Sequence, residues 1–153
     1  MLRLRSGPQD MPTRLSLALM LAAAYLAQGM WADRIMDGPD AAPRSVVAIA
    51  VQFGAVMILL QLRHLSARVP QTISALAGTG FLFGLASILL LSQLTPGEPA
   101  PGVAMAYFGL FFWSLAVDAH IYRHALSTNL SFGVMVAVLI FGLNFLVLRT
   151  AFG

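Results

Sequence analysis

Five long apolar stretches, separated by short polar segments, limit the folds open to this chain more than any other feature. A helix of about 20 apolar residues crosses the hydrocarbon core of a bilayer, and within lipid a helix satisfies its own backbone hydrogen bonds. The pattern therefore predicts an all-α integral membrane protein, a single bundle of five transmembrane helices within residues 1–153. The predicted spans are residues 15–32, 45–62, 70–94, 103–122 and 130–148.

The composition agrees with a membrane protein and excludes several other classes. Of the residues, 59% are hydrophobic and 10% are charged, whereas soluble domains carry about 25% charged residues. The chain has no Cys, which rules out disulfides and thiolate metal sites. The connections between spans are short, so we expect any function to be performed in the bilayer, at its interfaces or through partners.

Arginine positions predict the orientation of the bundle. All nine basic residues are Arg, a usage typical of a high-GC bacterial genome. They are spread along the chain and form no clustered basic face, so we expect no nucleic-acid partner. Cytoplasmic loops carry the excess of Arg and Lys, and an N-in, C-out bundle in the bacterial inner membrane gives six Arg inside against three outside. The inner set is Arg3, Arg5, Arg14, Arg63, Arg68 and Arg123, and the outer set is Arg34, Arg44 and Arg149.

The first apolar stretch has an alternative interpretation as a cleaved secretory signal. Basic residues precede it, and Ala27-Gln28-Gly29 forms a small-x-small cleavage pattern. Cleavage there would leave four spans and would not change the orientation of the remaining helices.

Two glycines in the third stretch predict a close helix contact. Gly80 and Gly84 have the GxxxG spacing, which places two residues without side chains on one helix face and lets another backbone approach. We expect packing within the bundle here, with a dimer interface as the alternative.

Several amides lie inside the predicted spans, where each is costly unless it is hydrogen-bonded. Gln52 and Asn144 lie closest to the middle of their spans, and Gln28 belongs to the first span. We expect these amides to form hydrogen bonds between helices.

The segment around Asp118 and His120 contains the most unusual residues. Asp118 is the one acidic residue inside a predicted span, four residues and about 6 Å from its end. It lies about 200° around the helix from His120, so the two cannot form a local pair. Asp118 is therefore either an ion-pair partner of Arg14 or Arg63, or a proton or ion relay together with His120.

The three histidines are weak candidates for a metal site. His120 and His124 are one helical turn apart, and the predicted topology places His64 on the same membrane face. Zinc needs at least three protein ligands, and no acidic residue stands between the two histidines as in H-E-x-x-H.

The sequence contains no nucleophile elbow, phosphate loop or pair of carboxylates within the spans. We therefore expect a small bacterial inner-membrane helical-bundle protein without catalytic activity or cofactor. Its expected partners are the lipid bilayer and other membrane proteins, as a subunit or accessory of a larger membrane assembly. The first alternative is a proton- or ion-coupled transport component that uses Asp118 and His120. The second is a metal- or haem-binding membrane protein.

Overall fold

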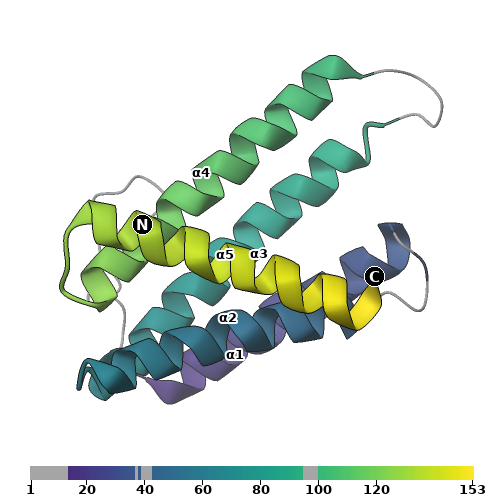
Figure 1. The fold of residues 1–153 in the computed structure, drawn as a ribbon. Helices are drawn as coiled ribbons and strands as arrows, with labels where there is room; N and C mark the ends of the chain where they lie inside the picture. Colours follow the sequence, from purple (N-terminus) through teal and green to yellow (C-terminus); the bar gives the residue numbers. More distant parts are fainter. Residues whose placement is uncertain (1–13, 37, 39–42, 95–99) are drawn as a thin grey trace.

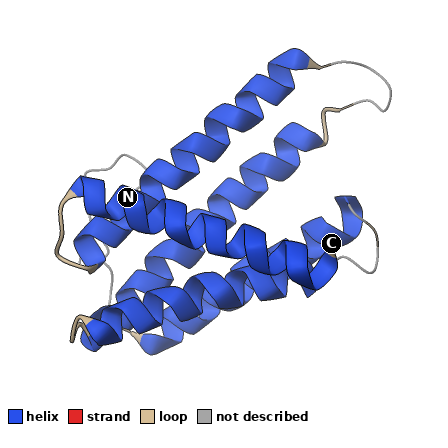
Figure 2. Cartoon of the chain, in the orientation of Figure 1, coloured by secondary structure: helices blue, strands red, loops and turns tan. Residues whose placement is uncertain are grey.

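The described part of the chain is all-helical. The computed structural model describes residues 14–36, 38, 43–94 and 100–153, and Figures 1 and 2 show helices without strands in these ranges. All five long helices are long and apolar enough to cross a membrane, which confirms the predicted all-α class. They are α1 (Leu15–Met36), α2 (Pro43–Leu62), α3 (Val69–Leu91), α4 (Pro101–Ala125) and α5 (Leu130–Phe152), with a short 3-10 turn η3 (Ser66–Arg68) before α3.

Most helices extend beyond the predicted spans. The α1 helix continues to Met36 and α4 continues to Ala125, because hydropathy marks the apolar part of a helix and not the end of its backbone hydrogen bonding. Asp118 therefore lies seven residues, about 10 Å, from the end of its helix, which is farther from that end than the sequence indicated. The α3 helix instead ends at Leu91, short of the predicted residue 94.

Local sequence signals explain where several helices begin. Pro70 and Pro101 lie in the first turns of α3 and α4, where the missing N–H costs no intrahelical hydrogen bond. The Asn129 side chain accepts a hydrogen bond from the Phe132 backbone N–H at 2.9 Å and so caps the start of α5. His64 and Ser127, with positive φ angles of 56° and 53°, form the tight turns before η3 and α5.

The helices converge at one end and diverge at the other. We call the end with the turns at His64 and Ser127 the closed end, and the opposite end, where α1 finishes and α2 starts, the open end. The α4 helix packs against α5 near the closed end, at Ala119 and Gly133. The α1 helix lies along α3 and also contacts α2, at Ser45 near the open end. Figure 1 shows α3 and α4 running together away from α2 and α5 toward the open end. The bundle is therefore V-shaped, with α1 between its two arms.

The hydrophobic core lies in the closed half of the bundle. Leu60, Leu76, Val117, Ile121 and Tyr122 are almost fully buried there. A Cβ built on Gly133 of α5 would collide with the Ala119 carbonyl oxygen of α4, so these two backbones touch where the arms meet. The core is therefore concentrated where the two arms meet, while α1 and α2 also pack closely near the open end, at Gly29 and Ser45.

Arg68 joins the two turns of the closed end. Its Nη1 donates hydrogen bonds to the carbonyl oxygens of His124 and Ala125, both at 3.1 Å, and to Ser127 Oγ at 2.6 Å. The last carbonyls of a helix have no partner within the helix, and a cation there also opposes the negative end of the helix dipole. Arg68 thus fixes the end of α4 against the start of α3.

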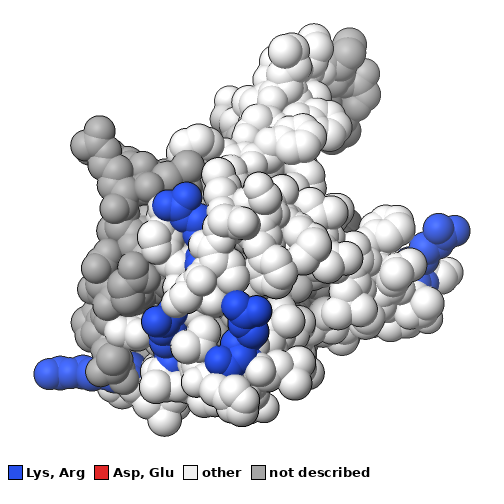
Figure 3. Space-filling view, turned by 60° about the vertical axis from the view of Figure 1, so that its left-hand side comes forward, with Lys and Arg blue, Asp and Glu red and all other residues white. Residues whose placement is uncertain are grey.

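Charged residues are unevenly distributed in the described ranges. Arg14, Arg63, Arg68 and Arg123 lie at the closed end, and Figure 3 shows Arg side chains on this face of the molecule. The two acidic residues of the described ranges, Asp33 and Asp118, both lie inside the V. The described acidic side chains therefore lie between the arms, whereas the described Arg residues lie at both ends of the bundle, with Arg34, Arg44 and Arg149 at the open end.

Candidate functional site

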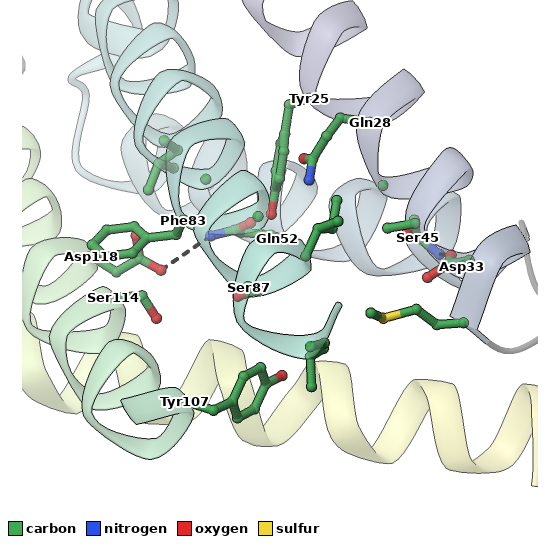
Figure 4. A pocket seen from close by; sticks show the side chains of 18 residues that line it. Tyr25, Gln28, Asp33, Ser45, Gln52, Phe83, Ser87, Tyr107, Ser114 and Asp118 are labelled. Carbon is green, nitrogen blue, oxygen red and sulfur yellow. Dashed lines mark hydrogen bonds between the residues drawn. The ribbon is translucent and has the colours of Figure 1, made fainter. Parts of the chain in front are cut away.

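A polar cavity of about 330 Å³ lies between the arms of the V. Helices α1, α2, α3 and α4 all contribute to its wall, and Figure 4 shows their polar side chains directed into the same space. The wall runs from residues near the open end, such as Asp33 and Leu91, down to Leu76 and Asp118 near the core. Its polar side chains are those of Tyr25, Gln28, Asp33, Ser45, Gln52, Ser87, Tyr107, Ser114 and Asp118.

Asp118 and Gln52 form the inner end of this cavity. Gln52 Nε2 donates to Asp118 Oδ2 at 3.4 Å and to the Tyr122 hydroxyl at 3.3 Å. Both distances are slightly longer than those of typical N–H···O hydrogen bonds. One amide nitrogen thus serves two acceptors. Asp118 is only partly buried, and the geometry leaves its carboxylate facing the cavity.

A second chamber of about 240 Å³ adjoins the first on the α5 side. The two chambers share Tyr25, Gln52, Ser114 and Asp118. Residues of α5, including Phe141 and Asn144, form one wall of the second chamber. Asp118 therefore lies in the wall between two adjoining spaces.

Glycines on α3 allow α1 to reach the cavity. A Cβ on Gly80 would lie 2.7 Å from Tyr25 Cζ, and a Cβ on Gly84 would lie 2.6 Å from Gln28 Oε1. Both separations are shorter than real Cβ contacts, so no larger residue fits without movement. The GxxxG pair packs α1 against α3 within one chain, and it positions Tyr25 and Gln28 in the cavity wall.

Two buried amide oxygens in the cavity walls accept no hydrogen bond from any described residue. They are Gln28 Oε1 in the larger chamber and Asn144 Oδ1 in the smaller one. Gln28 is only 8% exposed. A buried acceptor without a donor costs about 1–3 kcal/mol, so both chambers contain sites suited to a donor.

At the open end, Asp33 has a structural contact. Its Oδ2 accepts a hydrogen bond from the Ser45 backbone N–H at 2.9 Å, which satisfies a donor in the first turn of α2. The carboxylate also lies at the positive end of that helix dipole. Asp33 thus connects α1 to α2 and adds negative charge to the cavity.

The structure separates the residues that the sequence grouped around Asp118. His120 is 3% exposed and its ring packs edge-on against that of His124, with centroids 4.6 Å apart, and neither lines the cavity. Arg14 and Arg63 are exposed, and the hydrogen bond of Asp118 is with Gln52 instead. The expected ion pair of Asp118 with either Arg is therefore not formed, since both cations point outward at the closed end.

His64 lies apart from the other two weak metal candidates, His120 and His124. His64 is exposed in the turn after α2, whereas His120 is buried in α4. Within the described ranges, no three His, Asp or Glu side chains come close enough to hold a metal ion.

Sequence reasoning missed the contribution of α1 and of the hydroxyl groups. Tyr25 and Ser114 line both chambers, but a tyrosine or serine in an apolar span gives no signal without knowledge of its neighbours. Ser114 lies one turn before Asp118 on α4, and that spacing is the one sequence feature that could have indicated its place.

Comparison with known proteins adds no assignment. No family model, no curated protein and no solved structure matches this chain.

Proposed function

We propose that this chain is a proton- or ion-coupled transport component that acts through Asp118. The observation that carries the proposal is the position of this carboxylate, which lines two adjoining cavities and has an amide rather than a cation as its partner. Ionisable residues inside membrane helices are rare and usually mark ion or proton pathways. Between the two functions expected for Asp118, this geometry favours the relay over a structural ion pair.

The proposal includes the location of the protein and the absence of catalysis. We place it in the bacterial inner membrane with the closed end in the cytoplasm, because the Arg excess lies there. The V then opens to the periplasm. The described cavity walls contain no His, Cys or Lys, so they hold no Ser–His, Cys–His or Ser–Lys pair of the kind that activates a nucleophile. This supports a non-enzymatic function.

A flux measurement tests the proposal. Purified protein is reconstituted into vesicles that contain a pH-sensitive dye, and a potassium diffusion potential is applied. The wild type should move protons or a co-transported cation, and Asp118→Asn, which cannot release a proton, should abolish the flux. His120→Gln is the matched control on the same helix, because His120 lies outside the cavity, and it should retain the flux. Equal flux in wild type and Asp118→Asn would refute the proposal.

A second candidate is the subunit of a larger membrane assembly. The outer half of α4 favours it, since Met105 and Phe108 are 76% and 61% exposed there and the helix stands away from the α2–α5 arm (Figure 1). Lipid covers such a surface equally well. A photo-crosslinking amino acid in place of Phe108 decides between them, because a partner helix gives a protein adduct and lipid does not.

A further inference from the structure

The charge of the cavity indicates what kind of ligand it accepts. Asp33 and Asp118 both line the larger chamber, and among its described lining residues there is no Arg, Lys or His. Carboxylates between low-dielectric walls concentrate cations and repel anions. The cavity therefore favours a cation over an anion.

The unsatisfied amide oxygens add a second, independent requirement. Gln28 Oε1 is buried in the wall of the larger chamber, and Asn144 Oδ1 is buried in that of the smaller one. Acceptors without donors favour a ligand that carries N–H or O–H groups. A protonated amine meets both requirements, because it is a cation and a donor.

The size and the remaining wall of the cavity argue against a bare metal ion. Small-molecule sites typically enclose about 300–1,000 Å³, and the larger chamber, at about 330 Å³, falls within this range. Divalent metal ions are usually held by several carboxylates or other oxygen ligands at close range, and among the described residues no three His, Asp or Glu side chains gather in one place. Tyr25, Phe83 and Tyr107 instead supply aromatic surface, and aromatic faces attract ammonium groups.

We propose that the cavity binds a small organic ammonium ion, with its nitrogen at the Asp118 carboxylate and its carbon skeleton against Phe83 and Tyr107 toward the open end. This inference rests on the proposed function, since it names the class of ion that the transport component carries. A carboxylate pairs with the charged nitrogen through charge-assisted hydrogen bonds, while the apolar wall accommodates the hydrocarbon.

Calorimetric titration of the purified full-length protein with n-butylammonium chloride tests the proposal. The wild type should bind saturably, and Asp118→Asn should bind at least about tenfold more weakly because the charged partner is lost. Neutral n-butanol, which has nearly the same shape, and sodium chloride at equal ionic strength are the controls and should show no saturable binding. Equal affinities for the amine and the alcohol, or unchanged binding in Asp118→Asn, would overturn the proposal.

A second measurement does not depend on the stability of the Asp118 variant. In Ser114→Cys protein, which keeps Asp118, n-butylammonium should slow the reaction of the thiol with a charged thiol reagent, and n-butanol should not. Absence of protection at saturating amine would contradict the assigned position. Proton flux without amine binding would overturn this inference alone, whereas amine binding without any flux would overturn the transport function and leave the binding site.

Discussion

A methyl group added at Gly80 should destabilise the bundle, because this glycine faces the ring of Tyr25. The new Cβ would lie 2.7, 3.0 and 3.1 Å from three ring atoms, so the ring must move by several tenths of an ångström. Overpacking of this kind costs about 1–3 kcal/mol, and the helix propensity of Ala returns about 0.5–1 kcal/mol. For Gly80→Ala we expect a net loss of up to about 2.5 kcal/mol.

Gly78→Ala is the matched control on the same helix. Its Cβ would meet only Leu21 Cδ1, at 3.9 Å, so the propensity gain should remain and the variant should be slightly more stable than wild type. Thermal unfolding in detergent, followed by circular dichroism, measures both. A change of 1 kcal/mol shifts the melting temperature by about 2–4 °C for a chain of this size. Relative to wild type, the melting temperature should therefore fall in Gly80→Ala and rise slightly in Gly78→Ala, so that the two variants differ by several degrees.

The double variant tests the cause of the effect. In a Tyr25→Ala background the collision is gone, so Gly80→Ala should become neutral or stabilising, and the two substitutions should be strongly non-additive. If Gly80→Ala raises the melting temperature of the otherwise wild-type protein as Gly78→Ala does, then α1 does not pack against α3 as described.

Two further substitutions test how the closed end is held together. Arg68→Gln should lower the free energy of unfolding by about 1–2 kcal/mol, because charged hydrogen bonds to two helix-end carbonyls and one hydroxyl are lost from a partly exposed site. Arg63 is exposed, so Arg63→Gln should change the free energy of unfolding by less than about 0.5 kcal/mol. Asn129→Ala should cost about 1 kcal/mol through loss of the α5 cap, whereas Asn129→Asp keeps an acceptor and should retain most of the stability. Chemical unfolding in detergent measures all four, and equal values for the Arg68 and Arg63 variants would show that Arg68 does not fix the end of α4.

Hydropathy was sufficient to predict the helices, because each apolar run is long enough to cross a bilayer and each break contains residues that end helices. The GxxxG pair indicated a close contact, but its partner could not be read from the sequence. That partner is the α1 segment with Tyr25 and Gln28, and contacts between helices depend on side chains that are distant in sequence.

The candidate site was predicted only in part. Asp118 stood out because a carboxylate in an apolar span is rare, and Gln52 stood out as a polar residue near the middle of its span. The sequence could not show that the two meet, nor that the predicted cations point away from them. Both facts depend on how the helices pack in three dimensions, which brings Gln52 of α2 to Asp118 of α4 and leaves Arg14 and Arg63 exposed at the closed end.

The most direct test of the central claim is whether the space around Asp118 contains water that enters from the open end. The chain has no Cys, so a single Ser114→Cys substitution gives a unique thiol in the wall of both chambers. A membrane-impermeant, positively charged thiol reagent added to intact cells should label it, while Ser74→Cys, at a fully buried position of α3, should remain unlabelled. If the Ser114→Cys thiol reacts no faster than the Ser74→Cys thiol, then Asp118 does not face an aqueous cavity and the proposed pathway is wrong.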